Sequence, residues 1–109
     1  NYSREGREAN IKLAQNLAQY LHNNGFDVVV SLVSPYRELR EEFKTKMGKD
    51  LIEIYVHTSE ERGREQYHVE YEEPLTGFID LSTEGESPAQ TFSKLLEELT
   101  EYDISFFNN

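Results

Sequence analysis

The feature that most constrains this chain is a short, nearly continuous run of β-branched residues at Phe26–Val33. A strand with one face in water alternates apolar and polar residues, whereas an unbroken apolar run is typical of a strand buried on both faces of a parallel sheet. Two further runs, Leu51–Val56 and Gly77–Leu81, are predicted to form strands of the same sheet. Parallel strands need crossover connections, so helices are expected between them.

The intervals between these runs carry helical patterns. Ser3 precedes apolar residues at three- and four-residue spacing, which predicts a capped helix that ends before Gly25. Ser34 as the N-cap and Pro35 at the first helical position predict a second helix that ends at Gly48.

A third helix is predicted after the last strand, because Ser87, Pro88 and Gln90 have the spacing of a capping box. The predicted fold class is therefore α/β, with three layers and a mostly parallel sheet that has helices on both faces. Residues 1–99 are expected to form one domain, and residues 100–109, which show no clear period, a C-terminal tail.

Length and charge exclude several classes of function. A chain of 109 residues holds one domain at most. A net charge of −10 argues against nucleic acid as a partner. No apolar stretch approaches the roughly 20 residues that a membrane span needs, and there is no leader pattern and no cysteine. We expect a cytoplasmic protein.

The segment Ser34–Arg37 is the first candidate site. It places a hydroxyl, backbone amides and a guanidinium at the carboxyl end of a predicted strand, where open α/β sheets bind ligands and a helix amino terminus attracts anions. From spacing alone, a plain helix cap at Ser34 and a solvated side chain at Arg37 are the favoured interpretation, because such caps are common.

Other polar groups point less clearly to chemistry. Arg7 and Asn10 lie three apart on the first predicted helix, so both can face one ligand, although such pairs are common on helix surfaces. The histidines, at positions 22, 57 and 68, have no metal-ligand spacing, so no metal site is predicted. The acidic run at residues 70–73 is interpreted as a solvated loop.

A phosphate loop is missing from these residues. The pattern G-x-x-x-x-G-K-[ST] is required, and the single Gly-Lys dipeptide, Gly48-Lys49, has Phe43 in place of the first glycine and Asp50 in place of the hydroxyl.

Four segments together resemble consecutive motifs of the adenylylsulfate kinases, in the same order: Tyr2–Ile11, Gly25–Glu41, Leu51–Thr58 and Tyr71–Pro74. The resemblance covers about residues 2–99, and the Ser-Pro-Tyr-Arg turn is among its strongest parts. It implies a partial P-loop kinase fold and the transfer of the γ-phosphoryl of ATP, with Mg²⁺, to the 3′-hydroxyl of adenylylsulfate in sulfate assimilation.

The resemblance also implies roles for particular residues. The implied substrate-binding set is Arg7, Asn10, Ile11, Ser34, Pro35 and Arg37. The first three match positions that line the adenylylsulfate pocket, and the others match the turn that faces the transferred phosphoryl group. A secondary role for Ser34 as a phosphate acceptor also comes from the resemblance alone.

The chain departs from the family pattern in two places. The family's P-loop and its strand would precede Asn1, and the family's long basic lid is replaced by a short segment between Thr58 and Tyr71, in which Arg62 and Arg64 are candidate substitutes for lid cations. The chain alone is therefore expected to be inactive. Two alternatives stay open: a non-catalytic nucleotide-binding or assembly module, and a small-molecule kinase with another acceptor. A P-loop in the upstream coding sequence would favour an enzyme, whereas a start at Asn1 would favour the module.

The missing strand has a structural consequence. In the family fold, the strands that match Phe26–Val33 and Leu51–Val56 both flank the P-loop strand and do not pair with each other. We therefore expect an upstream segment, a strand borrowed from a second copy in a homo-oligomer, or direct pairing of Val28–Val30 with Ile52–Ile54.

Overall fold

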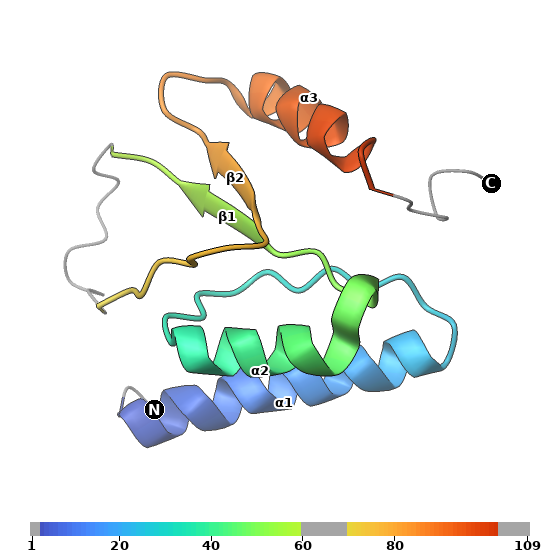
Figure 1. The fold of residues 1–109 in the computed structure, drawn as a ribbon. Helices are drawn as coiled ribbons and strands as arrows, with labels where there is room; N and C mark the ends of the chain where they lie inside the picture. The colour runs from blue at the N-terminus through green and yellow to red at the C-terminus, as the bar shows by residue number, and fades with distance from the viewer. Residues whose placement is uncertain (1–2, 60–69, 103–109) are drawn as a thin grey trace. The chain divides into compact units, whose positions relative to one another are not determined.

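The computed structural model describes residues 3–59 and 70–102 of the chain. The elements, in order, are α1 (Arg4–Asn23), α2 (Arg37–Met47), the 3-10 turn η1 (Gly48–Asp50), β1 (Ile54–His57), β2 (Ile79–Ser82) and α3 (Pro88–Leu99), as Figure 1 shows. They form two compact units: residues 3–51 with 70–73, and residues 52–59 with 74–102. Helices combined with a parallel strand pair confirm the α/β class.

Helix α1 of the first unit begins and ends where the sequence predicts. The Gly6 amide donates to Ser3 Oγ at 3.1 Å, which is the expected N-cap. Gly25 follows the C-cap with φ of 89°, a conformation that glycine adopts without strain. Ile11 and Ala18 are buried on one face of the helix, and the Gln15 side-chain amide donates to Leu39 O of α2 at 3.2 Å.

The two helices run side by side in the same direction, because the extended residues between them return along the pair (Figure 1). Helix α2 begins at Arg37, and its N-cap residue is Tyr36, with φ of −98°, ψ of 110° and no side-chain cap bond. The predictions that Ser34 caps this helix and that Pro35 is its first residue are therefore wrong. Pro35 is instead fully buried, and this anchors the turn in an extended conformation ahead of the helix.

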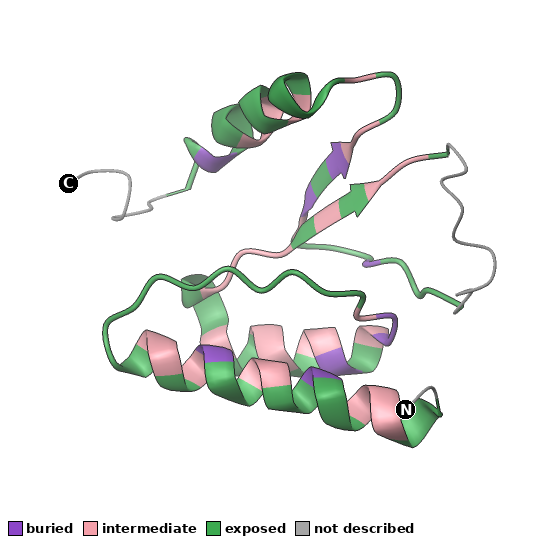
Figure 2. Ribbon diagram, turned by 180° about the vertical axis from the view of Figure 1, so that it is seen from behind, coloured by how far each residue is buried: buried purple, intermediate pink, exposed green. Residues whose placement is uncertain are grey.

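Residues 26–33 form no strand, so this prediction is wrong. Their side chains are largely exposed, up to 93% for Val29, and Figure 2 shows them as a continuous exposed stretch. A strand needs a neighbour to pair its backbone groups, and the described residues of the first unit contain no other strand. Since this run is in no ladder, direct pairing of Val28–Val30 with Ile52–Ile54 is wrong as well.

The second unit contains a pair of parallel strands, β1 and β2. Ile54 lies opposite Ile79 at one end of the pair, and His57 lies opposite Ser82 at the other. Both predicted strands are thus confirmed, each beginning two or three residues later than the apolar run. In β2, Ile79 and Leu81 are buried and Asp80 is exposed.

Helix α3 packs on this pair. Ile79 and Leu99 form a core with Ile52 and Leu95, and the predicted capping box at Ser87 is present with both of its hydrogen bonds. The boundary predicted after Leu99 stays a prediction, and residues 103–109 lie outside the described part of the chain. No helix in the described ranges is long and apolar enough to cross a membrane.

Candidate functional site

The candidate site lies in the first unit, where the turn at Ser34–Arg37 meets the amino-terminal half of α1. Tyr36 joins the two. Its ring is buried, at 5% exposure, and its hydroxyl accepts a hydrogen bond from Arg7 Nε at 2.8 Å. The Arg4 guanidinium lies 4.1 Å from the centre of the same ring, within the range of a cation–π contact.

The three candidate residues of α1 have different environments. Arg7 is half-buried beside Tyr36, whereas Asn10 is exposed. Ile11 is only 3% exposed and packs in a core cluster with Tyr36 and Leu39. The structure thus brings Arg7 to the turn and places Ile11 behind Tyr36, in the interior of the unit.

Ser34 has an unusual hydroxyl. Its Oγ is buried and has no hydrogen-bond partner within the described residues. Its carbonyl accepts from Arg40 Nη1 at 2.5 Å. Buried hydroxyls nearly always have a partner, so this group has an unused capacity to bond a ligand or water.

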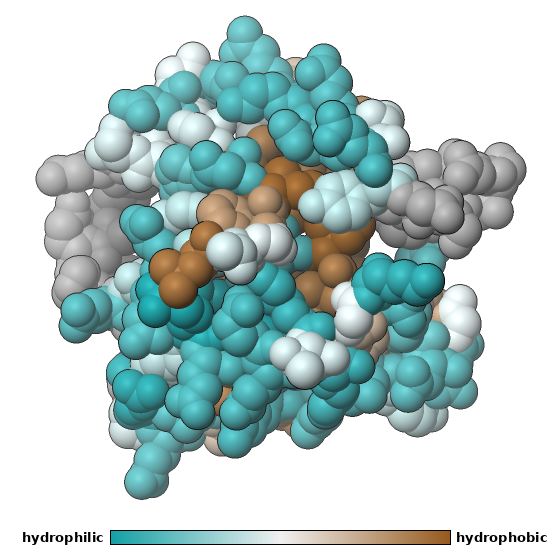
Figure 3. Space-filling model, viewed as in Figure 1, coloured by the Kyte–Doolittle hydropathy of each residue, from teal (hydrophilic) through white to brown (hydrophobic). Residues whose placement is uncertain are grey.

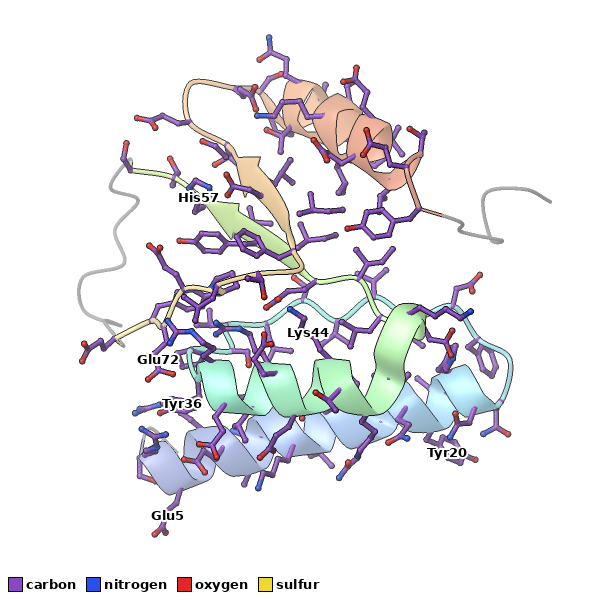
Figure 4. The ribbon with its side chains drawn as sticks, viewed as in Figure 1. Glu5, Tyr20, Tyr36, Lys44, His57 and Glu72 are labelled. Carbon is purple, nitrogen blue, oxygen red and sulfur yellow. The ribbon has the colours of Figure 1, made fainter. Side chains whose placement is uncertain are left out.

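The far side of the turn is held by residues 70–73. The Glu72 amide donates to Pro35 O at 2.9 Å, and the Arg37 amide donates to Glu72 Oε1 at 2.7 Å. Arg37 Nε donates to Glu73 O at 2.8 Å, which orients the guanidinium. The acidic run is exposed, as a solvated loop should be, yet it also fastens the turn, which sequence reasoning missed. Glu72 and Tyr36 are labelled in Figure 4, near the amino-terminal end of α2.

Two further arginines at the site were also missed. Arg40 donates to Glu72 O and lies 4.9 Å from the centre of the Tyr71 ring. Arg4 pairs with Glu8 at 2.6 Å, and this hydrogen bond raises the pKa of Arg4 above its usual value. Helical spacing could have indicated both arginines, because residues three apart lie on the same face of a helix. Arg4 is three residues from Arg7, and Arg40 is three residues from Arg37.

Four arginines gather at this turn, together with the carboxylates of Glu8 and of the acidic run at residues 70–73. The guanidinium groups of Arg4, Arg7, Arg37 and Arg40 lie on α1, on α2 and beside residues 70–73, in a chain with only 11 lysines and arginines and a net charge of −10. Such a cluster can attract an anion that the rest of the chain would repel.

The second unit contains another polar group and an apolar groove. His57 Nε2 lies 2.6 Å from Asp80 Oδ1 across the strand pair, and its ring stacks on Tyr55. A groove of about 420 Å³ is lined mostly by apolar side chains, among them Val56 and Phe92. Figure 3 shows that some hydrophobic residues reach the surface of the molecule among mostly hydrophilic ones. The described segments contain no cluster of three or more residues that could hold a metal ion. His68, Arg62 and Arg64 lie outside them.

Comparison with known proteins gives one consistent family. The family model described as Adenylylsulphate kinase matches residues 1–91. An adenylyl-sulfate kinase of Picosynechococcus sp. is 29% identical in an alignment that covers 92% of this chain and 67% of that protein. An adenylyl-sulfate kinase of Gloeothece citriformis is also 29% identical, in an alignment that covers 90% of this chain and 66% of that protein. A probable adenylyl-sulfate kinase of Pyrococcus abyssi is 36% identical over 56 residues, 51% of this chain and 32% of that protein.

The chain spans about two thirds of the length of the first two of these relatives. No solved structure matches it significantly.

Proposed function

Because the chain belongs to the adenylylsulphate kinase family, we propose that it forms the adenylylsulfate-binding side of a kinase that phosphorylates the 3′-hydroxyl of this nucleotide. The observation that carries the proposal is the 2.8 Å hydrogen bond from Arg7 to the Tyr36 hydroxyl. It joins the two motifs that the family resemblance marks for substrate binding, although they lie 29 residues apart in sequence. Sulfate assimilation in the cytoplasm is the corresponding cellular role.

The polar residues of the site have chemical tasks in this proposal. Arg7 and Arg37 supply cationic donors for the phosphosulfate group, and the Asn10 amide suits a ribose hydroxyl. Ser34 Oγ is unpaired within the described residues, so it can bond the ligand once the atoms that cover it are displaced. Phosphate transfer to Ser34 itself is secondary, because a buried hydroxyl is poorly placed to attack a second nucleotide.

The donor side of the reaction is not supplied by the residues described. ATP with Mg²⁺ is the phosphoryl donor that the family implies, but the 109 residues contain no phosphate-loop motif. In residues 3–59 and 70–102 no carboxylate cluster could hold the metal. No step through Mg²⁺ and ATP is therefore assigned to this chain. A catalytically silent nucleotide-binding module is the second candidate, favoured by the same missing motif.

Isothermal titration calorimetry tests the proposal. The chain should bind adenylylsulfate. Arg7→Ala should weaken binding by on the order of 1.5–3 kcal/mol, because a charge-assisted contact is lost, and Asn10→Ala by about 0.5–1.5 kcal/mol, because a neutral hydrogen bond is lost. Lys12→Ala is the matched control, because Lys12 is exposed on the same helix.

Equal adenylylsulfate affinity before and after the Arg7 and Asn10 substitutions would remove these residues from the site. Failure of the unmodified chain to bind adenylylsulfate would contradict the proposed function itself.

A further inference from the structure

Helix α2 receives its N-terminal hydrogen-bond partner from a distant part of the sequence. Its own N-cap, Tyr36, makes no side-chain cap bond. The Arg37 amide at the first helical position instead donates to Glu72 Oε1 at 2.7 Å, from 35 residues further along the chain. A carboxylate at a helix amino terminus satisfies an unpaired amide and interacts favourably with the helix dipole.

The backbone beside Glu72 is fastened to the same turn. The Glu72 amide donates to Pro35 O at 2.9 Å, and Glu73 O accepts from Arg37 Nε at 2.8 Å. These main-chain contacts do not require the Glu72 side chain, so residues 70–73 should stay in place when that side chain is replaced. The effect of the carboxylate can therefore be isolated by substitution.

The carboxylate acts on two groups that the proposed site uses. Arg37 is held at its amide by Glu72 and at Nε by Glu73, and its two terminal nitrogens have no protein partner in the described part of the chain. They are thus oriented and available for an anionic ligand. Ser34, whose unpaired hydroxyl lies three residues earlier, is in the same turn.

We propose that Glu72 is a positioning residue for adenylylsulfate binding: its carboxylate caps α2 and so fixes the turn that presents Ser34 and Arg37 to the ligand. This inference rests on the proposed function. Glu72 itself does not touch the nucleotide, because a second negative charge against the phosphosulfate would oppose binding. Its contribution is to lower the conformational freedom that the turn would otherwise lose when the ligand binds.

The test uses the full chain in three variants. Glu72→Ala removes the acceptor oxygen, Glu72→Gln keeps an acceptor oxygen without the charge, and Glu73→Gln is the matched control, because Glu73 contacts the turn only through its backbone. Hydrogen exchange of the Arg37 amide, measured by NMR without ligand, reports the cap. Calorimetry with adenylylsulfate, below the melting temperature of every variant, reports the site.

We expect exchange of the Arg37 amide to accelerate in Glu72→Ala and adenylylsulfate affinity to fall about tenfold, with a loss of about threefold in Glu72→Gln, since a neutral acceptor caps less strongly than a charged one. Glu73→Gln should match the unmodified chain. This graded rescue by glutamine separates positioning from a general loss of stability, which would lower the melting temperature and leave affinity unchanged.

Unchanged affinity in Glu72→Ala, in a chain that binds adenylylsulfate, overturns the inference while the proposed function stands. Unchanged protection of the Arg37 amide overturns it too, because the cap would then be absent. If the unmodified chain does not bind adenylylsulfate, the proposed function fails first and the ligand role of Glu72 fails with it.

Discussion

Ser34 and Ser87 each precede a proline, but their hydroxyls have opposite environments. Ser87 Oγ accepts from the Gln90 amide at 3.2 Å, and the Ser87 amide donates back to Gln90 Oε1 at 2.8 Å. Ser34 Oγ has no partner within the described residues. One serine therefore stabilises a helix, whereas the other keeps a buried donor unused.

The two serines should respond differently to alanine. Ser87→Ala should lower the free energy of unfolding by about 1 kcal/mol, because it removes a helix cap. Ser34→Ala should leave it unchanged or raise it by up to about 1 kcal/mol, because an unsatisfied buried hydroxyl is removed. Urea denaturation followed by circular dichroism measures both. A loss at Ser34 as large as that at Ser87 would mean that Ser34 has a stabilising partner.

This contrast indicates which residues a sequence can locate. The capping box at Ser87 is complete within four residues, so the sequence predicts it. The cap of α2 comes from Glu72, and no local pattern connects Glu72 with Arg37 across 35 positions. The sequence indicates Arg7 and Arg37 as candidates, whereas Tyr36, which joins α1 to the turn, enters the sequence analysis only as part of the Ser-Pro-Tyr-Arg turn, without a role of its own.

Among the elements, α3 is attached to its unit by an ion pair as well as by its apolar face. Lys94 Nζ lies 3.0 Å from Glu86 Oε1 and donates to Ser82 O of β2 at 2.9 Å. Thr91 Oγ1 also donates to Glu86, at 3.1 Å. The hydrogen bond from Lys94, supported by Thr91, lowers the pKa of Glu86 below its usual value of 4.5.

This shift predicts an acid-dependent loss of stability. A carboxyl group whose pKa is lower in the folded state contributes stability above its unfolded pKa and loses it as the pH falls through the folded value. Urea denaturation should therefore show the unmodified chain to be more stable than Glu86→Gln at neutral pH, and the difference should shrink below pH 4.5.

Glu97→Gln is the control for the Glu86 experiment, because it removes the same charge from an exposed position of α3. A stability difference between Glu86→Gln and the unmodified chain that persists unchanged in acid would contradict the assignment to the ion pair.

The strands show a different limit of sequence reasoning. The strands predicted at Leu51–Val56 and Gly77–Leu81 form in the structure because each is a pairing partner for the other, as the parallel strands β1 and β2. Phe26–Val33 has the composition of a buried strand, but strand formation depends on a partner for the backbone, which composition does not reveal. Its residues are accordingly extended and exposed.

For the molecule as a whole, this exposed run predicts self-association. An exposed apolar segment that lies in no strand ladder is a template for pairing with another chain. Val29 is 93% exposed at its centre, so Val29→Lys should shift the chain toward monomer in sedimentation velocity experiments. Leu13→Lys replaces a side chain that is 68% exposed on α1 and should have a smaller effect.

Sedimentation of the unmodified chain as a monomer at every protein concentration would contradict the predicted self-association. So would equal behaviour of the two lysine variants, since association would then not depend on the extended run.

The connection between the paired strands β1 and β2 can vary in length at little cost to the pair. Ile54 aligns with Ile79, so a loop of about 25 residues closes when the pair forms. The entropy of closing a flexible loop rises only with the logarithm of its length, and a doubling costs about 0.6 kcal/mol. By this measure, a moderate change in the length of the connection between β1 and β2 costs the strand pair little, so the register tolerates relatives with connections of different length.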